Sequence, residues 1–224
     1  MRTLILSGGQ IAEEEVKKVL ADVQSRGEKL MVIAADKGME AADRLGICPD
    51  WIIGDFDSAD QTMLEESRQL EKEGKSHLVL LNPIKDDTDS EAALHLAFRE
   101  SEGEIDLFGG SGTRIDHLLS NLCMMKQGLE ENRLIFLIDR NNRIRLMDAS
   151  HPVSIAKKDQ FGTYVSLIPL SGPAEGVTLK GFYYPLENAT LSGRDSLGTS
   201  NEIVESVGEI WIRSGVCAVI ESRD

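Results

Sequence analysis

The amino-acid sequence predicts a doubly wound α/β domain with a mainly parallel sheet, followed by a small antiparallel β-sandwich domain. In the first two-thirds of the chain, short runs of Ile, Val and Leu alternate with amphipathic stretches, which is typical of parallel strands covered by helices. From about Ile144, short alternating segments between turn residues replace the helical stretches. We therefore expect one domain over residues 1–142 and a second over residues 143–224.

The strands of the first domain are predicted from apolar runs bounded by polar residues or glycine. These runs show little alternation with polar residues, so both faces of each strand are expected to be buried. The runs cover residues 3–6, 30–35, 51–54, 78–81, 105–108 and 134–138.

Helices are expected between these strands. Apolar residues from Ile11 to Val23 recur at helical spacing, and Gly27 is placed to end that helix. Thr88 and Glu91 have the spacing of a capping box at the start of another helix. A third apolar stripe, closed near Gly128, consists of Ile115, Leu118, Leu119, Leu122 and Met125.

The second domain is predicted from strands over residues 164–170, 177–184, 209–213 and 216–221. Turn residues separate them at 171–173, 192–195 and 214–215. A domain of roughly 80 residues is marginal as an independent fold, so we expect it to pack on the first domain or on a second subunit.

Composition and charge exclude several classes of protein. The formal net charge of -14 is unfavourable for a nucleic-acid partner. No apolar run approaches the roughly 20 residues that cross a bilayer, and the first apolar run is too short for a signal peptide, so we expect a cytoplasmic protein without a membrane partner. The scattered Cys48, Cys123 and Cys217 favour neither a disulfide framework nor a zinc site, and we expect all three to be buried.

Aspartates follow several of the predicted parallel strands. Because the carboxyl ends of parallel strands share one edge of the sheet, these side chains are expected along a single rim. Aspartate is also common in turns and at helix N-caps, so each position alone carries little weight. The aspartates are Asp36, Asp55, Asp57, Asp86, Asp87, Asp89 and Asp116.

Crowded carboxylates raise one another's pKa unless a cation lies between them. Oxygen ligands of this kind favour magnesium or manganese over zinc. Magnesium binds only one or two protein carboxylates in most sites, so some of these aspartates are expected to act through water or on another substrate.

A glycine-rich segment, Gly109-Gly110-Ser111-Gly112-Thr113-Arg114, joins a predicted strand to a predicted helix. Such a segment lets backbone N–H groups approach an anion, and Arg114 is able to hold a phosphate through two hydrogen bonds. The sequence contains neither a P-loop motif nor a dinucleotide-binding fingerprint. An acidic metal site beside a phosphate-binding loop fits phosphoryl-type transfer.

At these residues the sequence resembles the thiamine pyrophosphokinase family, in its bacterial form. The similarity spans nearly the whole chain, and the matching segments occur in the family's order. They are Ala35-Asp36-Lys37-Gly38, Gly54-Asp55-Phe56-Asp57-Ser58, Asp86-Asp87-Thr88-Asp89, Gly109 to His117, and Ser200-Asn201.

The resemblance implies a kinase that transfers pyrophosphate from ATP to the hydroxyl of thiamine, giving thiamine diphosphate and AMP. It implies Mg²⁺ as cofactor, ATP and thiamine as partners, and a homodimer with thiamine near the subunit interface. Residues 1–142 would form the nucleotide- and metal-binding catalytic domain, and residues 143–224 the thiamine-binding domain.

The resemblance also implies roles for individual residues. The acidic metal and substrate site would consist of Asp36, Asp55, Asp57, Asp86 and Asp89, of which all but Asp36 would bind metal. Asp55, Asp57 and Asp89 would be catalytic, with either Asp89 or Asp57 accepting the proton from thiamine. Lys37, Gly110, Thr113, Arg114, Asp116 and His117 would lie by the nucleotide, and Ser200 and Asn201 would face thiamine or the nucleotide.

Two departures from the family pattern leave roles open. Lys37 stands where many relatives have glycine, and Lys85 where some have glutamine, so either lysine contacts phosphate or is simply solvated. Some relatives carry a tryptophan over thiamine in the last strand, where this chain has Val216 and Cys217, and Trp211 lies earlier. We therefore assign no aromatic stack from the sequence.

Two other functions compete with pyrophosphoryl transfer. Asp55-Phe56-Asp57 resembles the Asp-x-Asp of phosphatases that form an aspartyl-phosphate, although that mechanism leaves the glycine loop and Ser200-Asn201 unexplained. A non-catalytic nucleotide or metal sensor would use the same rim for binding alone.

Overall fold

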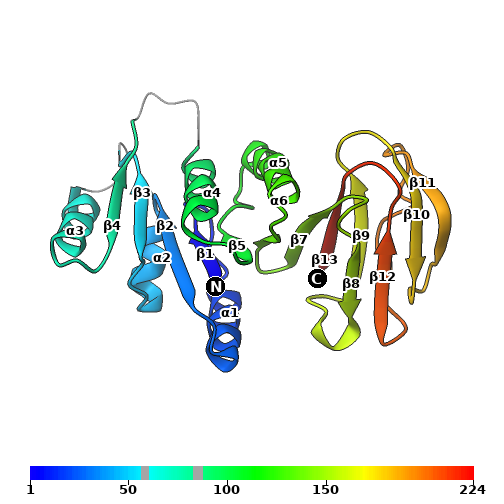
Figure 1. The fold of residues 1–224 in the computed structure, drawn as a ribbon, viewed down its shortest axis with the longest axis horizontal. Helices are drawn as coiled ribbons and strands as arrows, with labels where there is room; N and C mark the ends of the chain where they lie inside the picture. Colours follow the sequence, from blue (N-terminus) through cyan, green and yellow to red (C-terminus); the bar gives the residue numbers. More distant parts are fainter. Residues whose placement is uncertain (57–60, 83–87) are drawn as a thin grey trace. The chain divides into compact units, whose positions relative to one another are not determined.

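The computed structural model describes residues 1–56, 61–82 and 88–224, and the chain divides into two compact units (Figure 1). Unit 1 comprises Met1–Met124 and Arg133–Arg140, and unit 2 comprises Met125–Asn132 and Asn141–Asp224. The predicted fold class, a mainly parallel α/β domain followed by an antiparallel β-sandwich, is confirmed.

Unit 1 is built on a parallel sheet with the strand order β4-β3-β2-β1-β5-β6. Its central strands are almost entirely buried because helices cover both faces, as their apolar runs predict. The strands are β1 (Arg2–Leu6), β2 (Leu30–Ala35), β3 (Trp51–Gly54), β4 (His77–Leu80), β5 (Ile105–Phe108) and β6 (Ile135–Ile138).

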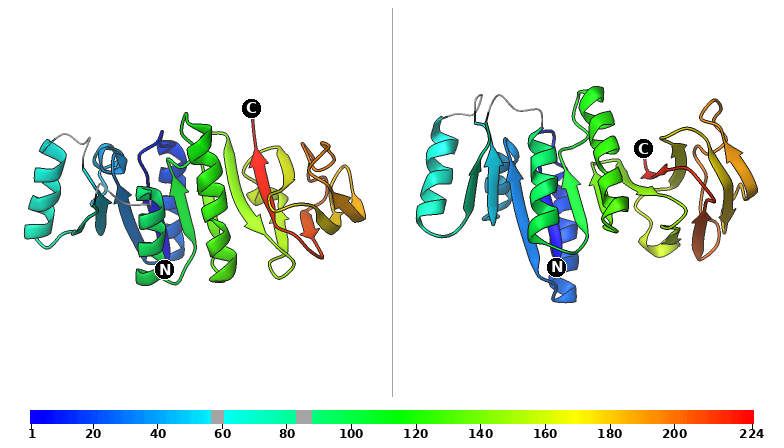
Figure 2. Two further views of the ribbon diagram at one scale, coloured as in Figure 1. Left: turned by 90° about the horizontal axis from the view of Figure 1, so that it is seen from above. Right: turned by 45° about the horizontal axis from the view of Figure 1, so that its top comes forward.

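The helices of unit 1 alternate with these strands. Seen from above in Figure 2, α1 and α2 lie on one face of the sheet and α4 lies on the other. The helices are α1 (Glu13–Arg26), α2 (Gly38–Leu45), α3 (Gln61–Lys72), α4 (Asp89–Glu100) and α5 (Ile115–Met124).

The direction of the chain along the sheet reverses between β1 and β5. From β1 the chain proceeds outward to β4, and it then crosses back to β5 on the other side of β1 before continuing to β6. The loops that leave β1 and β5 therefore run in opposite directions. This opens a crevice at the carboxyl ends of the central strands.

Local capping signals are confirmed at two of the three helix ends. Gly27 ends α1 in the left-handed conformation with φ of 62°, and the Thr88 hydroxyl accepts a hydrogen bond from Glu91 N at 3.2 Å. The third end was predicted wrongly, because α5 stops at Met124 and Gly128 lies inside a short helix of unit 2, α6 (Lys126–Glu130). The apolar stripe predicted for this helix is only partly buried, since Ile115 and Leu119 are 72% and 55% exposed.

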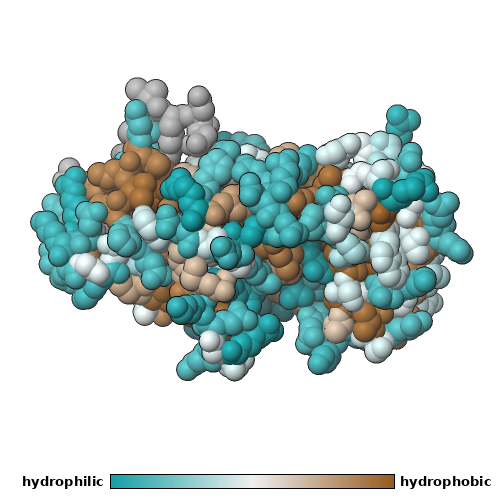
Figure 3. Space-filling view, in the orientation of Figure 1, coloured by the Kyte–Doolittle hydropathy of each residue, from teal (hydrophilic) through white to brown (hydrophobic). Residues whose placement is uncertain are grey.

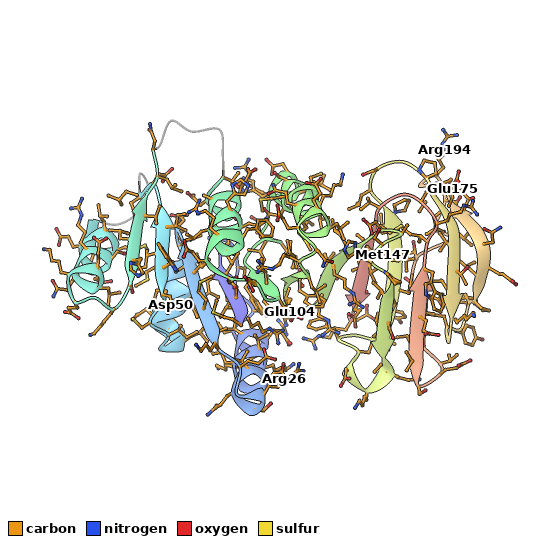
Figure 4. The ribbon with its side chains drawn as sticks, viewed as in Figure 1. Arg26, Asp50, Glu104, Met147, Glu175 and Arg194 are labelled. Atoms are coloured by element: carbon orange, nitrogen blue, oxygen red, sulfur yellow. The ribbon has the colours of Figure 1, made fainter. Side chains whose placement is uncertain are left out.

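Charged residues tie together the amino ends of the strands, opposite the crevice. The buried carboxylate of Asp106 accepts from Arg2 Nε at 2.5 Å, across 104 positions of the sequence. Arg2 also pairs with Asp22 and with Glu104, which is labelled in Figure 4 and directly precedes β5. Asp50, labelled there too, accepts from Val32 N at 2.7 Å.

Unit 2 consists of two antiparallel sheets with the orders β7-β13-β9 and β11-β10-β12-β8. One apolar core draws on both sheets, including Met147 (labelled in Figure 4), Val165, Leu179 and Ile210, so unit 2 is a sandwich. The strands are β7 (Asn142–Met147), β8 (Val153–Ala156), β9 (Tyr164–Pro169), β10 (Ala174–Lys180), β11 (Leu186–Leu191), β12 (Val207–Trp211) and β13 (Cys217–Ser222).

The strands β7, β8 and β11 and the helices α2 and α3 were not predicted. β11 is a largely exposed and polar strand beside β10, and β7 carries Arg143 and Arg145 within its run. Arg143 is accommodated because it donates twice to Glu221, which is 1% exposed, on the neighbouring β13. Such pairing becomes visible only once the two strands are side by side.

The expectation that all three cysteines are buried is wrong for two of them. Cys48 and Cys123 are exposed, and only Cys217 is buried, where burial raises the pKa of its thiol to about 11.

Apolar side chains gather on the surface over β4, an edge strand whose Leu80 is exposed (Figure 3). Across the described ranges, no helix is long and apolar enough to cross a bilayer.

Candidate functional site

A pocket of about 510 Å³ lies at the carboxyl edge of the sheet in unit 1. The loops that follow β1, β2, β3 and β5 and the amino end of α4 line it, so it occupies the crevice where the strand order reverses. This position follows directly from the parallel topology, which brings several strand ends to one place.

Two glycine turns form one side of the pocket by packing closely together. A Cβ added to Gly9 would lie 2.2 Å from the carbonyl oxygen of Gly109, and one added to Gly8 would lie 3.0 Å from Asp36 Oδ2. Side chains at these positions would therefore push the turns apart. Sequence reasoning missed Ser7, Gly8 and Gly9 as pocket residues, although the glycine pair after the first strand was the available signal.

The glycine loop after β5 is held in place by a buried amide. Asn121 Nδ2 donates to the Gly110 carbonyl at 2.7 Å, and Asn121 is 6% exposed. On the facing side, the hydroxyls of Ser7 and Ser90 are hydrogen bonded at 2.5 Å and connect the end of β1 to the start of α4. Asn121 and Ser90 also line the pocket, and neither was predicted.

Asp36 has an unfavourable backbone conformation and a carboxyl group whose charged form is disfavoured. Its φ is 49°, a left-handed value that few residues other than glycine adopt, and Phe56 at the end of the adjacent strand has φ of 52°. Burial raises the pKa of the Asp36 carboxyl, and the nearby Asp89 and Asp55 raise it further, against a backbone hydrogen bond from Lys37. Strain of this kind gathers at functional sites.

Arg114 and Asp116 form an exposed ion pair at the mouth of the pocket. Two guanidinium nitrogens of Arg114 donate to the two carboxylate oxygens of Asp116, at 3.1 Å and 2.5 Å. The hydrogen bonds from Arg114 lower the pKa of Asp116 to about 2. Arg114 lines the pocket itself, whereas Asp116 reaches it through Arg114.

Most of the predicted site residues that the structure describes in unit 1 come together in this pocket. Asp57, Asp86, Asp87 and Lys85 lie outside the described residues. Among the residues that are described, no group of three or more His, Cys, Asp or Glu side chains is placed to hold a metal ion. The predicted residues that line the pocket are Asp36, Lys37, Asp55, Asp89, Gly110, Thr113, Arg114 and His117.

Ser200 and Asn201 lie in unit 2, and they differ in accessibility. Ser200 is exposed and has φ of 55°. Asn201 is 6% exposed, and its amide is occupied by hydrogen bonds to the backbone of Tyr184 and Glu202. Asn201 thus holds a neighbouring loop in place.

Unit 1 and its pocket define a doubly wound α/β protein with a polar, carboxylate-lined ligand site where the strand order reverses. Residues 25–137 match the family model described as "Thiamin pyrophosphokinase, catalytic domain", and residues 150–217 match "Thiamin pyrophosphokinase, vitamin B1 binding domain". The chain belongs to the thiamine pyrophosphokinase family.

Individual relatives match over the full length of the chain. The thiamine pyrophosphokinase of Bacillus subtilis (strain 168) is 33% identical over 226 aligned positions, covering 100% of both proteins. A crystal structure of thiamine pyrophosphokinase from Bacillus subtilis has a TM-score of 0.84 at 30% identity and covers 100% of both chains. One from Geobacillus thermodenitrificans has a TM-score of 0.79 at 29% identity, covering 100% of this chain and 98% of the other.

Proposed function

We propose that this chain transfers a pyrophosphoryl group from ATP to the hydroxyl of thiamine, producing thiamine diphosphate and AMP. One observation carries the proposal beyond family membership. The pocket places carboxylates from the ends of β2 and β3 and the start of α4 beside a glycine loop that ends in Arg114. Acidic and phosphate-binding elements so close together suit a reaction that depends on positioning and charge neutralisation.

Magnesium fits the residues that line this pocket. Asp36, Asp55 and Asp89 offer hard oxygen ligands. Burial is the main cause of the raised pKa of Asp36, and the negative charges of Asp89 and Asp55 raise it further, a repulsion that a cation would relieve. In the proposal Asp55 and Asp89, with Asp57 and Asp86 from outside the described residues, would hold the ion. Bound there, Mg²⁺ would neutralise charge on the phosphates of ATP.

The residues of the chain would act on ATP and thiamine in distinct ways. Backbone N–H groups of the two glycine turns would approach the phosphates, and Arg114 would exchange Asp116 for a phosphate oxygen. The thiamine hydroxyl oxygen would attack the β-phosphorus, the bond from that phosphorus to the AMP oxygen would break, and AMP would leave. Asp89 or Asp57 would accept the hydroxyl proton, with a benefit of roughly 10²–10⁴ in rate.

The organisation of the chain forms part of the same proposal. Residues 1–142 would bind nucleotide and metal, and residues 143–224 would bind thiamine. Ser200 would face a substrate, since its side chain is exposed. The protein would act as a cytoplasmic homodimer with thiamine near the subunit interface, and a measured mass of one subunit in solution would argue against that assembly.

Product analysis tests the reaction. Purified protein is mixed with ATP, Mg²⁺ and thiamine, and nucleotides and thiamine esters are separated by chromatography. Thiamine diphosphate and AMP in equal amounts, both dependent on thiamine and Mg²⁺, are the expected result. Release of ADP or free phosphate would refute the proposal, and a trapped phospho-aspartate would favour the phosphatase mechanism. Tight ATP binding without product would favour a sensor.

A further inference from the structure

Two adjacent aromatic side chains are exposed on unit 2, in the segment that joins β10 to β11. Tyr183 is 64% exposed and Tyr184 is 63% exposed. Their ring centroids lie 4.8 Å apart with an angle of 85° between the planes, so the two rings are perpendicular. In this edge-to-face arrangement, each ring keeps at least one face available to a ligand.

The segment that carries these tyrosines is anchored by buried groups. Asn201 accepts a hydrogen bond from Tyr184 N at 2.9 Å and donates one to Tyr184 O at 2.7 Å. Tyr183 N donates to Glu202 O at 2.8 Å, and the preceding Phe182 is buried in the core of unit 2. The backbone beneath the two rings is therefore fixed, which limits the ordering entropy that ligand binding would cost.

Exposed glutamates lie on the stretches of chain next to the one that carries the two rings. Glu202 is hydrogen bonded through its backbone to Tyr183, and Glu205 is hydrogen bonded through its backbone to Gly181, so both glutamates lie beside this segment. Both are exposed, as is Glu187 a few residues further along the chain. Exposed glutamates on the stretches of chain next to two exposed aromatic rings favour a ligand that is both cationic and flat.

Two other aromatic rings of unit 2 already have a cation of the chain over them. Lys180 Nζ lies 5.3 Å from the centre of the Trp211 ring, and the guanidinium groups of Arg143 and Arg223 lie over Phe161. Within the described part of the chain, no lysine or arginine occupies the corresponding position over Tyr183 or Tyr184. These two rings can thus receive a cation from outside.

We propose that the thiazolium ring of thiamine contacts the Tyr183–Tyr184 pair, and that Asn201 is the positioning residue that holds this pair in place. The inference rests on the proposed function, because thiamine is the substrate assigned there. It deepens that function by naming residues of unit 2 that would recognise the permanent positive charge of thiamine. The segment lies within residues 150–217, which match the vitamin B1 binding domain.

The first experiment compares Tyr183→Leu and Tyr184→Leu with Tyr183→Phe and Tyr184→Phe. Leucine removes the aromatic face, whereas phenylalanine keeps it. We expect at least one leucine variant to raise the KM for thiamine roughly 2- to 30-fold with an unchanged KM for ATP, as loss of a cation–π contact requires. The phenylalanine variants should stay near wild type, as should Leu197→Ala, a control at another exposed apolar residue of unit 2.

An uncharged thiamine analogue, with carbon in place of the quaternary ring nitrogen, tests the role of the charge. Used as a competitive inhibitor, it should lose less affinity than thiamine loses in the leucine variants. Asn201→Asp keeps the accepting oxygen and removes the donor to Tyr184 O, so it should raise the KM for thiamine with little change in kcat. A purely structural role would instead lower kcat and raise both KM values together.

Direct titration of thiamine by calorimetry separates this inference from the proposed function. If wild type forms no thiamine diphosphate but the leucine variants still bind thiamine more weakly, the proposed function fails and the contact stands. If wild type is active and the leucine variants bind thiamine normally, the contact is refuted. Leucine variants that dissociate into single subunits and lose affinity for both substrates would also refute it, because the tyrosines would then form a subunit contact.

Discussion

Arg114 holds the carboxylate of Asp116 through two parallel hydrogen bonds, at 3.1 Å and 2.5 Å, at the mouth of the unit 1 pocket. The guanidinium expected to bind phosphate is therefore paired with a residue of the first turn of α5. Because Arg114 lowers the pKa of Asp116 to about 2, this carboxylate stays charged throughout the pH range of ordinary assays. The pair is exposed, so phosphate can replace Asp116 at little cost.

We expect Arg114→Gln to raise the KM for ATP roughly 10- to 150-fold, the loss that corresponds to a charge-assisted hydrogen bond of about 1.5–3 kcal/mol. Steady-state kinetics with varied ATP would measure it. Arg213→Gln is the matched control, because Arg213 also forms an exposed ion pair, with Glu175 (labelled in Figure 4 on unit 2), far from this pocket in sequence. An unchanged KM for ATP in Arg114→Gln would remove Arg114 from the proposed site.

Asp89→Asn and Asp57→Asn should each abolish turnover and leave the fold intact. Both substitutions remove a negative charge and a proton acceptor while keeping the shape of the side chain. For Asp57, which lies outside the described residues, the expectation rests on the sequence alone. Activity and thermal unfolding would be measured together, with Asp43→Asn on the exposed side of α2 as the control. Near-normal activity in either variant would contradict the catalytic role of that residue.

Asp36→Asn should raise the melting temperature at neutral pH and lower activity. The pKa of Asp36 in the folded protein lies above its ordinary value of 3.8, so between these two values the folded state binds more protons than the unfolded state. Stability is therefore lost as the pH rises through this window, and the charged carboxylate opposes folding at neutral pH. Asparagine removes that penalty.

Thermal unfolding at a series of pH values tests the origin of this gain. The advantage of Asp36→Asn should shrink as the pH falls toward 3.8, because the wild-type carboxyl becomes neutral as well. A gain that is equal at every pH would contradict the electrostatic explanation. It would show that asparagine simply tolerates the left-handed backbone at φ of 49° better than aspartate.

Gly9→Ala should destabilise unit 1 and disturb the pocket. The added Cβ would lie 2.2 Å from the Gly109 carbonyl oxygen, which is a backbone atom and cannot rotate away. Overpacking of this kind costs about 1–3 kcal/mol, or a few degrees of melting temperature per kcal/mol. Gly112→Ala is the matched control in the same pocket, since the nearest atom to its Cβ would be Arg114 N at 4.0 Å. Equal melting temperatures for the two variants would contradict the close packing of the glycine turns.

The sequence by itself determined the features that depend on neighbouring residues. Apolar runs predict the parallel strands because burial on both faces favours apolar residues at successive positions. Thr88 and Gly27 mark helix ends because capping involves residues within one turn. The aspartates after β2 and β3 could be placed on one edge, since the carboxyl ends of parallel strands meet there.

Only the tertiary structure decided which distant residues touch. The contact of Gly9 with Gly109 and the pairing of Arg2 with Asp106 both depend on β1 lying beside β5. The anchoring of Tyr184 by Asn201 likewise depends on how the segments of the sandwich pair. Periodicity and capping act over a few residues, whereas strand order is set by the packing of the whole sheet, so no local pattern contains these contacts.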